Sequence, residues 1–354
     1  MPSLRTASRR QLTLFIAVSG VLVAAVAAVI LPVPYVILSP GPTLNTIGKG
    51  PAGRSLIQIA GHPTYPAVGH LNLVTVSFQG GPSDSLNVFA ALRAWLTPHE
   101  AVVPEQELFG PGQTQQEVVR QDTQQMASSQ QTATAAALCV LGVNFKTVDT
   151  IVTVAKGYPA ASVLRRGDVI TAVDGKPVTC KMSSAPMIRA RPPGAPVTLT
   201  IARTVGGHRV AKVVHLKTRA AGGHAVIGVS VSESYVFPFR VKIRVGDIGG
   251  PSAGLMFALG IVDKLTPGNL TAGKFVAGTG EISADGTVSP IGGIQQKMVG
   301  ARQAGATVFL TPAANCADTS GAVPRGMRLV KVSTLAGAMS ALKALAAGRS
   351  VPSC

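Results

Sequence analysis

Residues 249–265 read GGPSAGLMFALGIVDKL. Two glycines and Pro251 stand before a long apolar run, which predicts a turn followed by a helix. Because the run is apolar on all sides, we expect this helix to be buried in the middle of a domain. Ser252 lies at the predicted first turn, where free backbone N–H groups and the positive end of the helix dipole can stabilise an oxyanion. Serine is also a common N-cap, so this position alone does not separate a catalytic serine from a structural one.

A second helix is predicted over residues 292–306 (GGIQQKMVGARQAGA), between a glycine pair and Gly305. At about 100° per residue, Lys297 falls on the apolar face with Ile294 and Ala301. A lysine is rarely buried, and loss of water lowers its pKa until the neutral amine can act as a general base. A serine with a desolvated lysine is a known pair for acyl transfer. The structural alternative is a lysine whose ammonium group reaches back to solvent.

Three short motifs occur in a fixed order along the C-terminal part of the chain. They are GPSAG at residues 250–254, TGEIS at residues 279–283 and PIGGI at residues 290–294, which Lys297 follows. In this order and at this spacing they resemble the proteolytic domain of Lon-type proteases. The resemblance implies that Ser252 is the nucleophile and Lys297 the general base.

The same resemblance implies two supporting residues and an extent for the domain. Thr279 matches the hydroxyl that hydrogen-bonds the lysine in that family, and Glu281 matches an acid beside the site. The resemblance spans residues 225 to about 345. Residues 69–77 and 126–137 resemble, more faintly, the opening strand and first helix of the same domain. The block between the two parts would then be an insertion.

Two features depart from the Lon pattern. Lon proteins often carry an aspartate three residues before the serine, where this chain has Gly249. Lon proteases also carry an ATPase, whereas residues 268–275 (GNLTAGKF) only approach a Walker A motif, with Phe275 in place of the magnesium-binding Ser or Thr. We therefore expect activity without ATP. No CxxC, HxxxH or HExxH spacing occurs, so we expect no metal and no other cofactor.

The inserted block resembles a PDZ domain. Residues 157–178 (GYPAASVLRRGDVITAVDGKPV) carry the Pro-Ala, Gly-Asp-Val-Ile and Asp-Gly elements of that family in order. PDZ domains bind a peptide C-terminus by adding it as a strand to a sheet edge. The resemblance implies that Ile151, Val152 and Thr153 belong to that edge, with the carboxylate loop at residues 145–149. The alternative is a spacer of PDZ shape whose groove is blocked.

The N-terminal sequence predicts a membrane anchor. Arg5, Arg9 and Arg10 precede residues 12–31, a nearly continuous apolar run long enough to cross a bilayer. The positive-inside bias places the arginines in the cytoplasm, so residues from Pro40 onward are expected outside the cytoplasmic membrane. A cleaved signal peptide is the alternative, but the small-x-small triplet at residues 25–27 lies in the middle of the apolar run.

Composition narrows the classes of partner. The 354 residues carry a formal net charge of +17, which favours anionic surfaces, including acidic lipids. Nucleic acid is not expected as a partner, because the basic residues are scattered and aromatic residues make up only 4%. The four cysteines fit an oxidising exterior. We expect Cys139 to pair with Cys180 and Cys316 with Cys354, with buried free thiols as the alternative.

Local patterns predict the remaining elements. We expect a strand over residues 71–78 and a helix over residues 84–96, with Trp95 in the core. Residues 39–53 read as a linker or loop, and an alanine-rich helix is predicted over residues 126–140, after a polar segment. Ser83 ends a second GGPS tetrapeptide, but Asp84 follows it and would oppose an oxyanion. We interpret Ser83 as an N-cap.

These observations predict an α+β fold in which a Lon-type proteolytic domain carries an inserted β-rich PDZ domain and follows one N-terminal transmembrane helix. The predicted parts are a basic N-terminus (1–10), the anchor (11–38), a linker with the first part of the protease domain (39–142), the PDZ domain (143–222), the catalytic part (223–347) and a tail (348–354).

The predicted function is that of an ATP-independent serine endopeptidase with a Ser252/Lys297 dyad. Its expected substrates are unfolded or PDZ-recruited extracytoplasmic polypeptides, recruited by docking of their C-terminal peptides. The rival hypothesis is a PDZ scaffold or chaperone with an inactive peptidase fold. The sequence leaves open whether the chain forms a homo-oligomer, such as the rings seen among Lon-type proteases.

Overall fold

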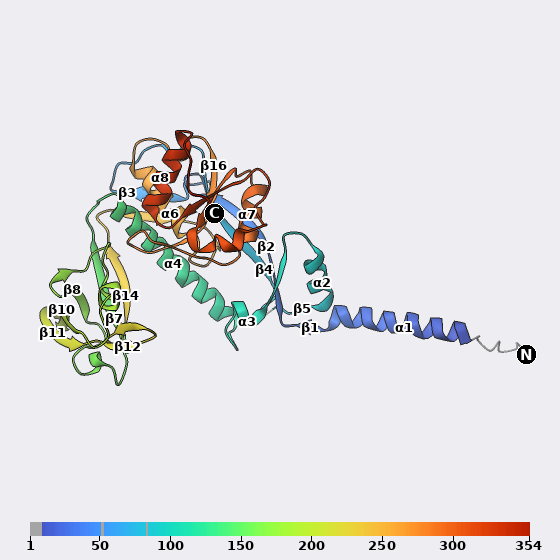
Figure 1. Cartoon of the computed structure of the whole chain (residues 1–354), viewed down its shortest axis with the longest axis horizontal. Coiled ribbons are helices and arrows are strands. Elements are labelled where there is room, and N and C mark those ends of the chain that lie inside the picture. The colour runs from blue at the N-terminus through green and yellow to red at the C-terminus, as the bar shows by residue number, and fades with distance from the viewer. Residues whose placement is uncertain (1–8, 51–52, 83) are drawn as a thin grey trace, which may run out of the picture.

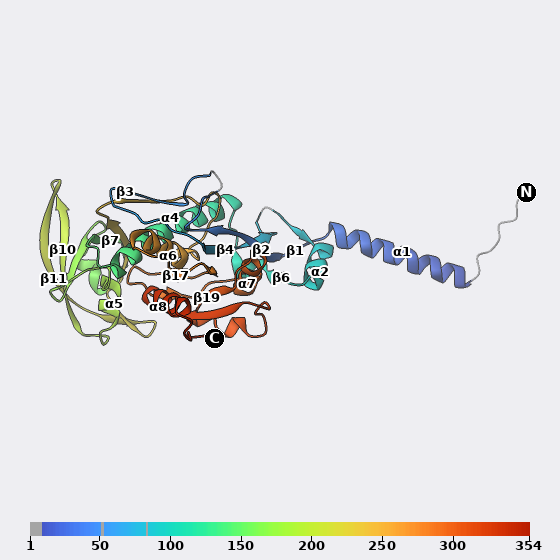
Figure 2. The same cartoon turned by 90° about the horizontal axis from the view of Figure 1, so that it is seen from above.

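The computed structural model describes residues 9–50, 53–82 and 84–354. Most of the basic N-terminus, with Arg5, and the predicted N-cap Ser83 lie outside the described residues. Figures 1 and 2 show three parts in a row: one long helix, a central body of helices around a sheet, and a β-rich unit at the far end. The expected α+β class is confirmed.

The long helix is α1 (Arg9–Ile30). Its segment Leu12–Ile30 is long and apolar enough to cross a membrane, and none of it is buried against the rest of the chain. The predicted anchor over residues 11–38 is too long, because the helix ends at Ile30 and two strands follow, β1 (Pro32–Val33) and β2 (Tyr35–Asn45). The prediction failed because residues 31–38 continue the uncharged stretch; Pro32 and Pro34, which do not continue a helix, were the available signal.

The central body is built on a six-stranded mixed sheet. Its order is β20-β19-β16-β4-β2-β6. The first four are parallel: β20 (Arg328–Val332), β19 (Val308–Pro312), β16 (Phe275–Gly278) and β4 (His70–Gln79). Strand β2 and then β6 (Ala101–Pro104) add to them antiparallel. The predicted strand over residues 71–78 is therefore confirmed as β4.

Strand β2 corrects the expected linker over residues 39–53. Residues 39–45 are part of the sheet, although Pro40 and Pro42 cannot donate backbone hydrogen bonds. The pairing with β4 shifts its register between Pro40 and Thr43, so the prolines sit at an irregularity where ladder hydrogen bonds are interrupted anyway. Proline and glycine content alone therefore misplaced this segment.

Helices cover both faces of the sheet. One face carries α4 (Gln115–Val140), α6 (Gly254–Leu265) and α8 (Leu335–Ala346), whereas α7 (Ile294–Gln303) packs on the other. Neighbouring strand residues alternate between the two cores, as the period of a strand requires: Leu73 points to the α6 side and Val74 to the α7 side. Strand β4 precedes the PDZ block and pairs with β16, which follows it, so the two parts share one sheet.

Helix α4 is longer than the sequence suggested. Thr114 accepts a hydrogen bond from the N–H of Glu117, whose carboxylate accepts one from the N–H of Thr114, and this capping box starts the helix at Gln115. The expected polar segment before residue 126 is helical as well. The glutamine-rich turns of this segment lack the apolar stripe by which a helix is recognised. The Thr-x-x-Glu spacing at residues 114–117 was the available signal for the start of the helix.

A small subdomain lies between α1 and the sheet. It contains β5 (Leu86–Asn87), which pairs with β1, then α2 (Val88–Leu96), and α3 (Glu105–Leu108) follows β6. Two residues of the predicted helix over residues 84–96 therefore belong to a strand. The prediction that Trp95 is a core residue is wrong, because its side chain is 76% exposed. Helical spacing identified its apolar face but not what that face meets.

Short elements complete the central body. They are β3 (Ile57–Ala60) paired with β15 (Arg240–Ile243), β17 (Glu281–Ile282) paired with β18 (Val288–Ser289), and the 3-10 helices η2 (Ala313–Asn315) and η3 (Ala317–Thr319).

The β-rich unit has its own sheet and core. The sheet order is β11-β10-β8-β7-β14, with β9 beside β8. Its elements are β7 (Lys146–Val154), η1 (Pro159–Ser162), β8 (Val169–Val173), β9 (Lys176–Pro177), α5 (Ser184–Arg189), β10 (Pro196–Val205), β11 (His208–Lys217), the hairpin β12 (Arg219–Ala221) with β13 (His224–Val226), and β14 (Val229–Val236). Ile151, Leu199 and Ile201 lie in its separate core.

The edge strand of this unit is not the one expected. Residues 151–154 lie in β7, which pairs with β8 on one side and with β14 on the other. The prediction of a free edge there is wrong, since β14 joins the sheet from about 80 residues later in the chain. Strand β14, which has a named partner only on its β7 side among the described residues, forms one edge, and β11 forms the other.

The structure contains both expected disulfides. Cys139–Cys180 joins the end of α4 to the loop after β9, and so links the central body to the β-rich unit. Cys316–Cys354 holds the C-terminal tail against the segment between η2 and η3.

Loss of the first disulfide should lower stability measurably. The bond closes a loop with a sequence separation of 41 residues. In the chain-entropy model such a loop contributes about 4 kcal/mol to the free energy of unfolding. We expect the double variant Cys139→Ser/Cys180→Ser to lose up to this amount in denaturant titrations without reductant. A reduced wild-type chain that unfolds at the same denaturant concentration as the oxidised one would contradict this account.

Candidate active site

Ser252 and Lys297 come together although helices α6 and α7 pack on opposite faces of the sheet. The Lys297 Nζ is 3.0 Å from the Ser252 Oγ, a hydrogen-bond distance. Ser252 precedes α6, and Lys297 lies in the first turn of α7. The structure therefore brings the two predicted dyad residues together.

The glycine pair before α7 has a conformational reason. Gly293 is the N-cap of α7 and has a φ of 66°, in the left-handed region that favours glycine. A Cβ at this position would lie 2.7 Å from a methyl group of Val76 in β4. Gly300, two turns later, faces the carbonyl of Gly41 in β2 with little room for a side chain. These glycines let α7 approach β2 and β4 closely enough for Lys297 to reach the serine.

Ser252 lies in a turn, not in the helix itself. Helix α6 begins at Gly254 with Ala253 as N-cap, so the expectation that Ser252 occupies the first helical turn is wrong by two residues. The turn is held from β16: the Thr279 Oγ1 donates to the Ser252 carbonyl at 2.9 Å, and the Gly280 N–H donates to the same carbonyl at 2.8 Å. Through this hydrogen bond the buried Thr279 positions the backbone of Ser252. Among the described residues it has no hydrogen bond to Lys297, in contrast to the role that the resemblance implied.

The environment of Lys297 favours its neutral form. Its side chain is almost fully buried, on the apolar face of α7 with Ile294 and Ala301. Burial lowers the pKa of Lys297 to about 8, because an ammonium ion loses its hydration in such a place. No salt bridge to Lys297 is found within the described part of the chain. The neighbouring Gln296 is buried as well.

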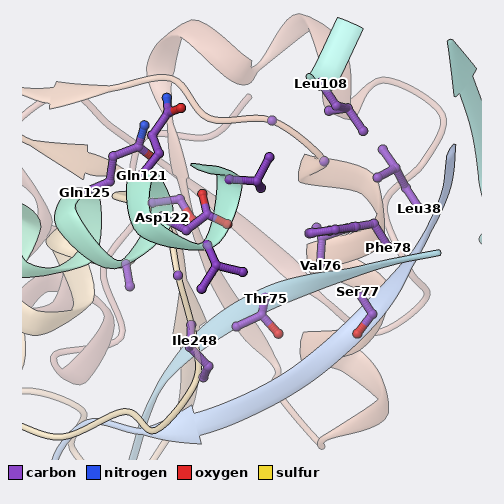
Figure 3. A pocket seen from close by; sticks show the side chains of 18 of the residues that line it. Leu38, Thr75, Val76, Ser77, Phe78, Leu108, Gln121, Asp122, Gln125 and Ile248 are labelled. Carbon is purple, nitrogen blue, oxygen red and sulfur yellow. The ribbon is translucent and has the colours of Figure 1, made fainter. Parts of the chain in front are cut away.

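Ser252 and Lys297 line a pocket of about 760 Å³. Figure 3 shows Leu38, Phe78 and Leu108 grouped at one end of this pocket and Gln121 and Gln125 at the other. The backbone N–H groups of Ser252 and Ala253 have no backbone acceptor among the described residues, and they lie at the positive end of the α6 dipole. The pocket thus combines a serine hydroxyl, a buried lysine amine, available N–H donors and an apolar end.

Sequence reasoning missed Asp122. This residue of α4 projects into the pocket (Figure 3). Burial raises the pKa of its carboxyl group. The Asp122 carbonyl accepts a hydrogen bond from the N–H of Gly250, and a Cβ on Gly249 would lie 2.6 Å from the Cβ of Asp122. Asp122 therefore fills the space beside Gly249, where the Lon pattern has its own aspartate. The available signal in the sequence was Gly249 itself, because a residue without a side chain leaves room for the side chain of a residue from another element.

Glu281 does not belong to the pocket. It lies in β17 with an exposed side chain and is absent from the pocket lining. The predicted peptide-binding residues lie in the β-rich unit. Of these, Ile151 is in the core, and only Thr153 lines the groove found there.

This groove has a volume of about 540 Å³ and lies between β14 and α5. Val229, Ser230 and Val231 of the edge strand line one side, and Ala185 and Arg189 of α5 line the other. The helix is held in place by Asp149 of β7, whose Oδ2 accepts hydrogen bonds from the N–H and the hydroxyl of Ser184. Residues 145–149, which were predicted as the carboxylate loop, do not line this groove. They lie within β7 or directly before it.

Comparison with known proteins agrees with this geometry. Residues 241–342 match the family model of the Lon protease (S16) C-terminal proteolytic domain. This match contains both Ser252 and Lys297. The chain contains a Lon-type proteolytic domain. Residues 139–214 match the family model of the PDZ domain, so the second part of the expected architecture is confirmed.

Several curated proteins resemble the Lon-type part. The chain is 33% identical over 103 residues to Lon protease of Roseiflexus castenholzii, which covers 28% of this chain and 13% of that protein. It is 43% identical over 79 residues to Lon protease 2 of Herpetosiphon aurantiacus, covering 22% of this chain and 9% of that protein. The chain thus spans about a tenth of the length of these relatives.

A solved PDZ structure also matches. It is the PDZ domain of the SdrC-like protein from Listeria monocytogenes, with 26% identity and a TM-score of 0.20, covering 23% of this chain and 85% of that one.

The close packing of Gly249 against Asp122 makes a specific prediction for the Lon-type domain. We expect Gly249→Ala to lower the free energy of unfolding by about 1–3 kcal/mol, since the new methyl group would overlap the Asp122 side chain. Gly292→Ala is the matched control, because Gly292 lines the same pocket but has no heavy atom within 4 Å of its added Cβ. Equal stability of the two variants in thermal unfolding would refute the steric account.

Proposed function

We propose that this chain is a membrane-anchored serine endopeptidase that works without ATP and uses Ser252 and Lys297 as its catalytic dyad. The proposal rests above all on one observation, the 3.0 Å approach of a buried lysine amine to a serine hydroxyl. The match to the Lon protease proteolytic domain supports the class of chemistry. Independence from ATP is proposed because the printed sequence carries no complete P-loop motif.

The proposed reaction is acyl transfer to Ser252 followed by hydrolysis. The neutral Lys297 amine takes the proton of the Ser252 hydroxyl while the Oγ attacks the carbonyl carbon of the scissile peptide bond. Backbone N–H groups at the start of α6 stabilise the resulting oxyanion. The Lys297 ammonium then gives its proton to the leaving amine, so the peptide bond breaks and an ester remains on Ser252. Lys297 next removes a proton from water as the water oxygen attacks the ester carbonyl carbon. The Lys297 ammonium then gives this proton to the departing Ser252 Oγ, which releases the acid product and restores both residues.

Thr279 and Asp122 act as positioning residues in this proposal. Thr279 and the Gly280 N–H hold the carbonyl of Ser252, which fixes the direction of its side chain. Asp122 fixes the preceding glycines through its own carbonyl group. Glu281 takes no part in this proposal, because its exposed side chain does not line the pocket.

The location proposed for the site is outside the cytoplasmic membrane. Helix α1 would span the bilayer with Arg9 and Arg10 on the cytoplasmic side. The two disulfides support an oxidising compartment for the folded part. The domain boundaries are proposed as the sequence suggested them, with two changes: the anchor ends at Ile30, and the PDZ unit extends to Val236.

The dyad predicts how the rate depends on pH and on Lys297. Since the free amine is the base and the pKa of Lys297 is about 8, turnover should fall about tenfold per pH unit below that value and level off above it. Lys297→Arg should abolish turnover at every pH, because a guanidinium group keeps its proton. The measurement is hydrolysis of an unfolded protein by the full chain in detergent, from pH 6 to pH 10.

Two further variants make this test specific. Ser252→Ala should be as inactive as Lys297→Arg, and the double variant no worse, because the two residues act as one unit. Lys331→Arg should keep the wild-type rate, since this exposed lysine of β20 lies outside the pocket. Wild-type turnover in Ser252→Ala would exclude the mechanism, whereas a wild-type chain inactive on every polypeptide would favour a PDZ scaffold or chaperone.

For the PDZ unit we propose that a substrate C-terminus adds as a strand to β14, in the groove beside α5. The free edge of β14, the apolar lining and the cation of Arg189 support this placement. Such docking contributes binding energy equally to the ground state and the transition state. It should therefore affect KM and leave kcat unchanged.

A bulky side chain in the groove tests this placement. We expect Ala185→Trp to raise KM about tenfold for a protein substrate, with kcat unchanged, because the indole would occupy the space of the peptide. Val210→Trp is the control, since Val210 is exposed on β11, away from the groove. An unchanged KM in Ala185→Trp would favour the spacer interpretation of the PDZ unit.

A further inference from the structure

Helix α2 exposes its large apolar residues, whereas a helix on a soluble surface buries them. The side that packs on the protein contains Ala90 and the fully buried Ala94. The opposite side presents four large apolar residues to the outside: Phe89 (59% exposed), Leu92 (50%), Trp95 (76%) and Leu96 (80%). A helix on a soluble surface buries its large apolar residues and exposes polar ones. The apolar side of α2, defined by these four residues, has no partner among the described residues.

The position of α2 indicates what covers this surface. The helix packs against α1, and the short pair of β1 and β5 ties it to the chain directly after α1 (Figures 1 and 2). Leu31 and Tyr35, at the start of the connection and of β2, are also exposed. The apolar surface of α2 is thus continuous with the surface of α1, which is itself apolar and exposed along its length.

We propose that α2 lies in the headgroup region of the membrane that α1 spans, with Phe89, Leu92, Trp95 and Leu96 inserted into its outer leaflet. Continuity with α1 favours lipid over a second copy of the chain as the occupant. Tryptophan at the edge of an apolar surface is typical of membrane interfaces, where its ring sits at headgroup level. Arg93, exposed on the same helix, and the net charge of +17 suit anionic headgroups.

This contact would fix the central body on the membrane at a second point. A single spanning helix leaves the attached body free to tilt, whereas an interfacial helix beside it defines one orientation. The body is then held with the β2 and β6 side of its sheet closest to the lipid, since α2 contacts both of these strands. Leu38 of β2 lines the pocket of Ser252, so the site would face a defined layer close to the bilayer.

Trp95 is the only tryptophan of the chain, so its fluorescence reports on α2 alone. The natural full-length chain is reconstituted into vesicles of zwitterionic and anionic phospholipids that carry bromine atoms at defined acyl-chain depths. We expect bromines near the headgroups to quench at least about half of the emission, and bromines near the bilayer centre to quench less, because an interfacial helix lies only about 5–10 Å deep.

Two control variants separate this inference from the anchoring on which it rests. In Trp95→Phe/Leu22→Trp the fluorophore lies in the middle of α1, and deep bromines should quench it most. In Trp95→Phe/Val213→Trp it lies on β11 of the PDZ unit, at the far end of the molecule from α1 in Figure 1, and lipid bromines should leave it unquenched.

Each outcome decides between the occupants. Quenching of Trp95 by shallow bromines supports the interfacial position. If the α1 probe is quenched and Trp95 is not, anchoring stands and the interfacial inference is overturned. Blue-shifted Trp95 emission without lipid quenching would identify a protein contact, such as a second copy, and would also overturn it. If neither probe is quenched, the proposed anchoring itself fails.

Discussion

The loss of water around the Lys297 amine is the constraint on which the central body depends. A lysine can be held in such a place only if the elements on both faces of the sheet converge there. Helix α7 approaches β2 and β4 through Gly293 and Gly300, and the chain after β16 turns to hold the Ser252 carbonyl. Apolar packing over the whole sheet offsets the cost of burying the amine. Substitutions far from the site can therefore alter the basicity of Lys297 by admitting water.

The contact between Ser252 and Lys297 could be predicted from sequence because the two residues stand in short local patterns. Ser252 precedes an all-apolar helix, and the period of α7 places Lys297 with Ile294. Two of the failures concerned a partner distant in sequence. Strand β14 pairs with β7 across the whole PDZ block, and Asp122 meets Gly249 from α4. Trp95 failed for a different reason, because a helical period shows an apolar face without saying whether protein or another apolar medium meets it.

The PDZ unit is coupled to the site by covalent connections at both of its ends. Helix α4, which carries Asp122, leads into β7 and is linked to the unit again by the Cys139–Cys180 disulfide. At the other end, β14 is followed by β15 and then by the turn with Ser252. The strand that forms the groove is thus the last element of the unit before the chain returns to the site. A peptide on β14 would be held on a strand that only β15 separates from the turn with Ser252.

Only residues 31–34 separate the end of α1 from β2, the strand that contributes Leu38 to the pocket. Four residues extend over at most about 14 Å, so the tether has almost no slack. If the proposed function and anchoring hold, the chain works as a catalyst at the membrane surface. A polypeptide that is itself bound to the bilayer would meet it by lateral diffusion in two dimensions, at a high local concentration. A soluble polypeptide would first have to reach the surface. Substrate selectivity would then depend in part on which polypeptides stay close to the membrane surface.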